Sequence, residues 1–245
     1  MESVKLTVIG CSPAWPNPGG AQSGYLVETG GSLLLDCGPG VLARLRLEGG
    51  WPEPDAIALT HFHLDHCGDL IPWVWGSFYE RDATDRRLRP ELWVPPGGRR
   101  RLAGIGSEFG FTNMFEQVFS IAEYEPGKPF VAGGQTVTAV RMLHYRIDAY
   151  GFRVCHDGAT LAYSGDSGPG DQLAELARDA DLFVCEATLA AGADEGELRG
   201  HLTLEEAEAA CAEANARRLL VTHRPVELET PSRFELAADG LVLEL

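Results

Sequence analysis

The sequence predicts an α/β fold built as a single domain over residues 1–245. The chain has 245 residues, of which 44% are hydrophobic, and this is enough for one substantial core. Short apolar runs bounded by glycine, proline or aspartate alternate with longer segments of helical periodicity. No linker, internal repeat or low-complexity segment divides the chain. These observations favour one domain of mixed strands and helices.

The amino-terminal half begins with strands. The expected strands are residues 4–10, 23–28, 32–36 and 55–60. Thr29-Gly30-Gly31 is typical of a hairpin turn between the second and third of them. Helices are expected over residues 41–47 and 68–81, and Pro72 falls early in the second helix, where a missing N–H has little effect.

The carboxyl-terminal half repeats this alternation. Strands are expected over residues 131–143, 150–156, 159–164, 181–185 and 218–222. Helices are expected over residues 171–178 and 203–215, and Thr203 and Glu206 have the spacing of a capping box. Asp239-Gly240 predicts a terminal hairpin between residues 233–237 and 241–245.

Composition limits the partners and the compartment. The net charge of −16 at pH 7 disfavours nucleic acid and anionic membranes. No apolar run is long enough to cross a bilayer, and the start of the chain lacks the basic residues of an export signal. Six scattered cysteines without a C-x-x-C pair indicate reduced thiols, and Cys67 is expected to be a small buried residue. We therefore predict a cytoplasmic protein.

Two segments allow more than one interpretation. Residues 81–101 contain seven of the 20 basic residues. A solvated surface is expected there, and the alternatives are contact with a phosphate-bearing substrate or with an acidic face of a second subunit. Residues 109–119 are apolar without clear periodicity and have glycines beside them. They are expected to form a mobile lid or the surface of a homodimer, and part of the core is an equally favoured alternative.

A short segment at the end of the fourth expected strand contains most of the candidate metal ligands. Thr60-His61-Phe62-His63-Leu64-Asp65-His66 places three imidazoles and one carboxylate within six residues. Side chains two apart on an extended segment point the same way, so His61 and His63 can face one point. Asp65 and His66 follow where the chain should turn into a helix, and they can face a second point. Such ligands suit zinc, and also iron, manganese or nickel.

This run resembles the HxHxDH signature of the metallo-β-lactamase superfamily. The resemblance implies a four-layer αββα sandwich with a dinuclear metal site at one edge. It also implies further ligands at strand ends, which His144, Asp166 and His223 supply in order. By the same resemblance Asp36 supports the ligand loop by hydrogen bonds, although it is also placed to cap the helix that follows it.

The resemblance assigns each ligand to one of two divalent ions. The first ion would be held by His61, His63 and His144, the second by Asp65, His66 and His223, with Asp166 between them. Zinc is the expected metal, and manganese or iron also fits this donor set. A hydroxide that bridges the two ions would attack the substrate. Members that hydrolyse β-lactams usually have a cysteine in place of Asp166, which disfavours that activity here.

Two further residues resemble the tRNase Z-like phosphodiesterase branch of the superfamily. Glu186 lies in Cys185-Glu186-Ala187-Thr188 and His201 in Gly200-His201-Leu202-Thr203. The resemblance implies that His201 donates a proton to the leaving oxygen and that Glu186 orients and polarises His201. The expected catalytic residues are therefore Asp65, Glu186 and His201.

The favoured function is a phosphodiesterase for a small diester such as a cyclic nucleotide. The resemblance extends to a subgroup that includes atypical bacterial cyclic-AMP phosphodiesterases, through the segments around Asp166, Asp171 and Glu186. Three alternatives remain, namely a tRNA 3′-processing endonuclease, a lactone or thioester hydrolase, and a metal-binding scaffold without catalysis. The first is disfavoured because residues 144–166 leave no length for the arm with which tRNA-processing members hold their substrate.

Overall fold

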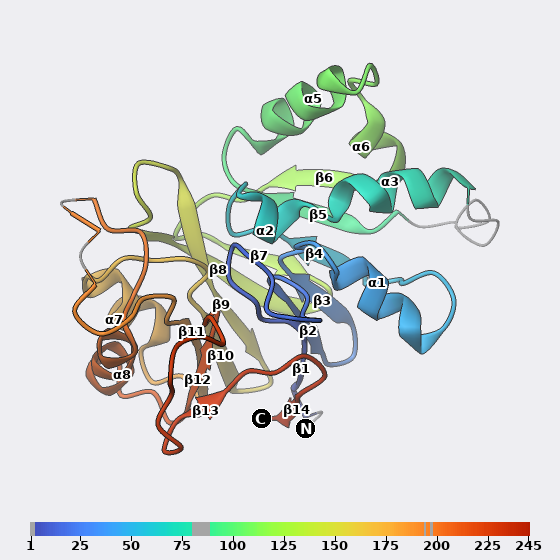
Figure 1. The fold of residues 1–245 in the computed structure, drawn as a ribbon. Coiled ribbons are helices and arrows are strands. Elements are labelled where there is room, and N and C mark those ends of the chain that lie inside the picture. The colour runs from blue at the N-terminus through green and yellow to red at the C-terminus, as the bar shows by residue number, and fades with distance from the viewer. Residues whose placement is uncertain (1–2, 80–88, 194, 197) are drawn as a thin grey trace.

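Two seven-stranded mixed sheets face each other in the computed structural model, which describes residues 3–79, 89–193, 195–196 and 198–245 (Figure 1). The first sheet has the strand order β14-β1-β2-β3-β4-β5-β6. Its strands are β1 (Lys5–Gly10), β2 (Gly24–Glu28), β3 (Ser32–Leu35), β4 (Ala56–Ala58), β5 (Glu91–Val94), β6 (Ser120–Glu123) and β14 (Val242–Glu244). The second has the order β13-β12-β11-β10-β9-β8-β7. Its strands are β7 (Pro129–Ala132), β8 (Gln135–Met142), β9 (Ala149–His156), β10 (Ala159–Tyr163), β11 (Leu182–Glu186), β12 (Leu219–Thr222) and β13 (Glu235–Leu236).

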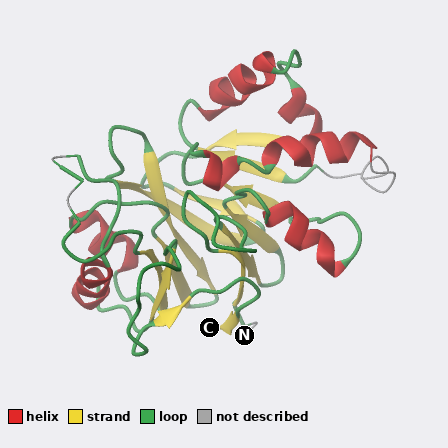
Figure 2. Ribbon diagram, in the orientation of Figure 1, coloured by secondary structure: helices red, strands yellow, loops and turns green. Residues whose placement is uncertain are grey.

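Helices cover the outer face of each sheet (Figures 1 and 2). The first sheet is covered by α1 (Val41–Leu45), α3 (Leu70–Tyr79), α5 (Gly98–Glu108) and α6 (Met114–Val118). The second is covered by α7 (Asp171–Ala177) and α8 (Leu204–Glu213). The short helix η1 (Arg46–Glu48) continues directly from α1, and the short helix α2 (Leu64–Cys67) follows β4. This arrangement confirms the predicted αββα sandwich.

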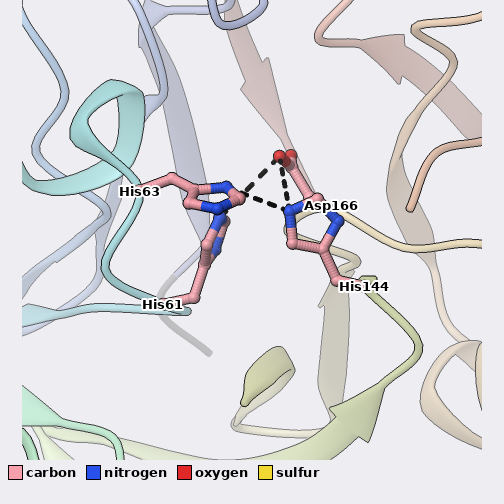
Figure 3. A group of neighbouring side chains, drawn as sticks. All are labelled: His61, His63, His144 and Asp166. Carbon is pink, nitrogen blue, oxygen red and sulfur yellow. Dashed lines mark hydrogen bonds and ion pairs between the residues drawn. The ribbon is translucent and has the colours of Figure 1, made fainter. Parts of the chain in front are cut away.

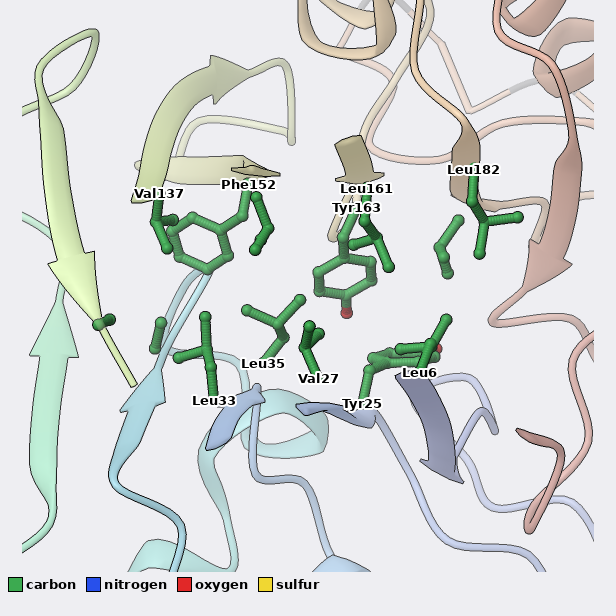
Figure 4. Close-up of a cluster of buried hydrophobic side chains, with 14 of the residues drawn as sticks. Leu6, Tyr25, Val27, Leu33, Leu35, Val137, Phe152, Leu161, Tyr163 and Leu182 are labelled. Carbon is green, nitrogen blue, oxygen red and sulfur yellow. The ribbon is translucent and has the colours of Figure 1, made fainter. Parts of the chain in front are cut away.

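The central strands are apolar on both faces because each sheet is covered on both sides. In β3, Leu33 and Leu35 point between the sheets, where they meet Val137, Phe152 and Leu161 of the second sheet (Figure 4). Leu34 points instead toward α1 and α3. Continuous apolar runs, rather than alternating ones, are therefore what this architecture requires.

The strand directions bring distant loops to one edge. Strands β3 and β4 run parallel in the first sheet, and β10, β11 and β12 run parallel in the second. Strand β8 runs in the same direction as β10, because both are antiparallel to β9 between them. The carboxyl ends of parallel strands share an edge, and ligand sites of open α/β sheets lie there. The loops after all six strands therefore meet at one rim.

The predicted terminal hairpin is wrong. Strand β13 pairs with β12 in the second sheet, whereas β14 pairs with β1 in the first. The turn at Asp239 is real, but its carboxylate accepts a hydrogen bond from Ala21 N at 2.7 Å and pairs with Arg44 at 2.9 Å. These contacts hold the turn at the junction of the two sheets, so the two strands diverge.

The two ambiguous segments are partly resolved. Residues 80–88 lie outside the described residues, and with them Arg81, Arg86 and Arg87 of the basic segment. In the aromatic segment Met114, Phe115 and Phe119 are buried against the first sheet, as expected for core residues. Phe109 is 52% exposed at the end of α5. Within the part of the chain that the structure describes, no helix has the length and apolar character needed to span a bilayer.

Candidate metal centre

The seven predicted ligands meet at the rim where the strands end. Strand β4 leads into His61 and His63, and His63 has the extended backbone of an N-cap (φ −68°, ψ 148°), from which α2 begins. Helix α2 then carries Asp65 and His66 on its first turn. His144 follows β8, and the remaining two ligands, Asp166 and His223, follow β10 and β12. All but the half-buried His63 are buried.

One group of donors surrounds the Oδ2 atom of Asp166. The Nε2 atoms of His61 and His144 lie 3.8 Å and 3.7 Å from this oxygen. The Nδ1 atom of His63 lies 3.1 Å from Nε2 of His144. Figure 3 shows the three rings converging with the carboxylate on one small volume. Their ligand atoms all lie within 4.8 Å of one another, so these four residues could hold one cation.

A second group surrounds the other oxygen of the same carboxylate. Nε2 of His66 and of His223 lie 3.1 Å and 3.5 Å from Oδ1 of Asp166. Oδ2 of Asp65 lies 3.1 Å from Nε2 of His223 and 3.4 Å from Nε2 of His66. These four ligand atoms also fit around one cation. Because its two oxygens face different donor groups, Asp166 is placed to bridge two cations.

Unsatisfied atoms indicate that this cluster fits metal ions. Nε2 of His61, Nε2 of His66 and Oδ1 of Asp166 are fully buried and make no hydrogen bond with any described residue. Buried polar atoms rarely lack a partner, so a convergent set of them calls for a ligand. Imidazole nitrogens and carboxylate oxygens are donors for zinc, manganese or iron.

The ligand rings differ in protonation in the metal-free protein. Burial lowers the pKa of His61, His63 and His144, so their rings are neutral and have a free lone pair. Burial also acts to lower the pKa of His66, but the carboxylates of Asp166 and Asp36 outweigh it and raise this pKa. A proton therefore stays on His66 until a cation replaces it, and metal binding should release protons.

Hydrogen bonds orient the ligand rings. Asp36 Oδ2 accepts from Nδ1 of His66 at 2.7 Å, from the hydroxyl of Tyr163 at 2.8 Å and from that of Thr60 at 2.9 Å. Thr60 Oγ1 in turn lies 2.9 Å from Nδ1 of His61. Since these partners occupy Nδ1, Nε2 of each ring faces the cluster. Asp36 therefore has the supporting role, and the alternative that it caps α1 is wrong. The residue that accepts from the backbone of Leu42 is Asp69.

The same pattern supports the rings of His144 and His223, through groups to which the sequence analysis gave no role. Nδ1 of His144 donates to the carbonyl of Gly200 at 2.7 Å, and Nδ1 of His223 lies 2.9 Å from the hydroxyl of Thr188. Both residues belong to the segments singled out from the sequence, Thr188 to the one with Glu186 and Gly200 to the one with His201. The contact with Gly200 is a backbone contact and leaves no trace in residue type.

Two residues of the site, one supporting residue and one candidate ligand, have an unfavourable backbone conformation. Asp36 and His223 have φ values of 60° and 53°, which side chains other than glycine seldom adopt. Such strain persists where the surroundings enforce it, and it concentrates at functional sites. Cys67, beside His66, is buried and keeps its proton, because burial raises the pKa of its thiol to about 12. It is therefore a packing residue, as predicted.

Asp36→Asn should weaken metal binding without unfolding the protein. The amide retains the size of the carboxylate but loses the charge that holds His66 Nδ1 in place. Outer hydrogen-bond partners typically contribute about 10- to 100-fold in metal affinity, and we expect a loss of this size. Competition with a chromophoric chelator would measure it. An unchanged dissociation constant would show that Asp36 does not tune the site.

Glu186 and His201 form a pair beside this cluster. The Glu186 carboxylate is fully buried and accepts from Nδ1 of His201 at 2.8 Å, from the backbone N–H groups of Ser167 and Thr188, and from the Thr188 hydroxyl. Its oxygens are thus satisfied by four donors, so it orients His201 rather than binding a metal. The His201 ring stacks on that of His223, with centroids 5.8 Å apart and an interplanar angle of 18°.

Burial lowers the pKa of His201, but the charge and hydrogen bond of Glu186 outweigh it and raise this pKa to about 9. His201 is therefore a protonated imidazole at neutral pH, next to the proposed metal ligands. Its backbone N–H donates to Glu195, whose carboxylate also accepts from the Tyr145 hydroxyl at 2.7 Å. Neither Glu195 nor Tyr145 was singled out from the sequence. The arrangement can supply one proton at a fixed position.

Comparison with known proteins agrees with this geometry. Residues 32–224 match the family model of the beta-lactamase superfamily domain. An uncharacterized protein of Mycobacterium leprae is 35% identical over 228 residues, which cover 91% of this chain and 78% of that protein. The probable metallo-hydrolase YhfI of Bacillus subtilis is 34% identical over 227 residues, covering 91% and 87% of the two chains.

The crystal structure of YhfI superposes on this chain with a TM-score of 0.83 and 27% identity, covering 99% of each. A ribonuclease Z of Myxococcus xanthus is 29% identical over 310 aligned positions, covering 100% of this chain and 99% of that protein. The similarity therefore extends over both sheets and every candidate ligand.

Proposed function

This chain belongs to the beta-lactamase superfamily of metal-dependent hydrolases, and on that premise we propose that it is a dinuclear phosphodiesterase for a small diester such as a cyclic nucleotide. The observation that carries the proposal is the pair of donor groups that share Asp166, with the hydrogen-bonded pair of Glu186 and His201 beside them. When bound, two divalent cations supply a water molecule of lowered pKa and positive charge that stabilises the phosphate oxygens.

Side chains of this protein would position the substrate and supply the proton for the leaving group. Water adds to phosphorus, the bond from phosphorus to the leaving oxygen breaks, and His201 gives that oxygen a proton. Glu186 holds the ring through Nδ1, which leaves Nε2 for this transfer. Asp65, in the second donor group, would act as a ligand that also faces the reacting centre. The cleavage leaves a phosphate monoester and a free hydroxyl group, and for a cyclic nucleotide both belong to one nucleoside monophosphate.

A small substrate is favoured over tRNA. The net charge is −16, and residues 144–166 form the β9–β10 hairpin with a short loop before and after it, which leaves no length for an RNA-holding arm. Precursor tRNA is still the second candidate substrate, because a relative that this chain spans completely is named ribonuclease Z.

Turnover of four substrate classes by metal-loaded protein would test the proposal. We expect hydrolysis of cyclic AMP and of bis(p-nitrophenyl) phosphate, with no processing of precursor tRNA. Turnover only of a lactone or thioester would instead favour a carbonyl hydrolase. Metal binding with no turnover of any of these would favour a scaffold. Elemental analysis of the same samples tests the expected two zinc ions against manganese or iron. The homodimer and the cytoplasmic location remain predictions.

The proton-donating role of His201 predicts a pH profile. A general acid works only while protonated, so turnover should fall as pH rises through the pKa of His201. That pKa is about 9 without metal, and bound cations would move it lower. Glu186→Gln removes the charge that raises it and should move the descending limb toward lower pH. A limb at the same pH in both proteins would assign the titration to another group.

A further inference from the structure

A partly enclosed pocket adjoins the metal centre on the side of His63. Besides His63, its lining is mainly apolar and includes Phe62, Pro95, Pro96 and Ile147, with the charged side chains of Arg101 and Asp148 at its rim. Phe62 is half-buried and lies between His61 and His63 in the chain. A molecule held by the metals would therefore reach this pocket without leaving the site.

Two lining residues of the pocket, Phe62 and Arg101, have planar groups. The guanidinium carbon of Arg101 lies 5.8 Å from the centroid of the Phe62 ring. The ring lies beside the start of α5, where a Cβ added to Gly98 would come within 3.2 Å of it. Arg101 is exposed and forms no ion pair among the described residues, so the side of its guanidinium that faces away from Phe62 is accessible to a ligand. Aromatic rings and guanidinium planes are the surfaces on which nucleobases stack.

The pocket and the proposed acid serve different ends of a substrate. His201 packs against His144, Tyr145 and His223, none of which lines the pocket. The leaving group must lie at His201 to receive its proton. The group that stays on phosphorus is then the one that extends toward His63 and Phe62.

Resting on the phosphodiesterase function proposed above, we infer that this pocket binds a planar aromatic ring, such as a nucleobase, that is carried by the substituent retained on phosphorus. The cavity measures about 50 Å³. A cavity of about 150 Å³ encloses benzene, so the pocket takes the edge of one ring while the face of the ring lies on Phe62 and Arg101. A second anionic group fits less well, because the Asp148 carboxylate is part of the same lining.

Two diesters with the same leaving group separate the pocket from the chemistry. Thymidine 5′-(p-nitrophenyl phosphate) and methyl p-nitrophenyl phosphate both release p-nitrophenol and differ only in the retained group. We expect kcat/KM to be about tenfold higher for the thymidine ester, which is the order of one stacked base. Phe62→Leu and Arg101→Gln should each reduce this ratio toward one. Arg100→Gln is the matched control, since Arg100 is exposed on the same helix and does not line the pocket.

Binding of the product provides a second measurement. Thymidine 5′-monophosphate should bind about tenfold more tightly than methyl phosphate by calorimetry, and the two pocket variants should remove that difference. Equal kcat/KM for the two esters, or a ratio that survives both variants, would overturn the inference. A ratio lost in Arg101→Gln but kept in Phe62→Leu would also overturn it, in favour of a charge contact. If neither ester is hydrolysed, the proposed function fails, and the calorimetry still tests the pocket.

Discussion

Asp166→Ala is expected to abolish turnover and to leave fewer than two metal ions per chain. The two oxygens of this carboxylate face two separate donor groups, so its removal takes one ligand from each. It also leaves the buried His66 without one of the two carboxylates that stabilise its charge. Loss of a supporting residue outside a metal site costs about 10- to 100-fold, and the loss of this ligand should exceed that range.

Metal content by elemental analysis and turnover of bis(p-nitrophenyl) phosphate would be measured on the same samples. Asp171→Asn serves as the control, because Asp171 is an exposed aspartate at the start of α7, outside the cluster. A variant at Asp166 that kept two metal ions would exclude a bridging role for this residue. If it also kept turnover, the dinuclear mechanism would have to be abandoned.

His201→Ala is expected to keep the metal content and lose turnover selectively. His201 belongs to neither of the two donor groups that share Asp166, so its removal should leave metal binding unaffected. A positioned general acid contributes about 10²- to 10⁴-fold, and this full loss is expected for cyclic AMP, whose leaving group is an alkoxide. The loss should be much smaller for bis(p-nitrophenyl) phosphate, because p-nitrophenolate leaves without needing a proton.

The difference between the two substrates is the decisive measurement. A merely structural defect would reduce both activities equally, whereas loss of the acid affects chiefly the poor leaving group. His156→Ala is the matched control, since this histidine lies at the end of β9 and outside the candidate site. Unchanged turnover of cyclic AMP by His201→Ala would remove His201 from the mechanism.

The order of elements was largely readable from residue pattern. The strand before His61, the capping box at Thr203 and the strand before His223 all lie within a few residues of their predicted positions. These elements are predictable because they depend on hydrophobic periodicity and capping residues, which involve residues close together in the chain. The terminal hairpin failed for the complementary reason. Asp239-Gly240 favours a turn, but β13 pairs with the preceding strand β12, and β14 pairs with β1 at the other end of the chain.

By itself the sequence determined which residues are available for metal and acid chemistry, because imidazoles and carboxylates at strand ends in a family order are a property of the chain. Only the tertiary structure decided how they face one another. Three arrangements depend on two sheets packing with their strand ends at one rim. Oδ1 and Oδ2 of Asp166 lie near different histidines, four donors satisfy Glu186, and Arg101 lies over Phe62. Those distances are set by the packing of the buried side chains between the sheets, over separations that no local pattern encodes.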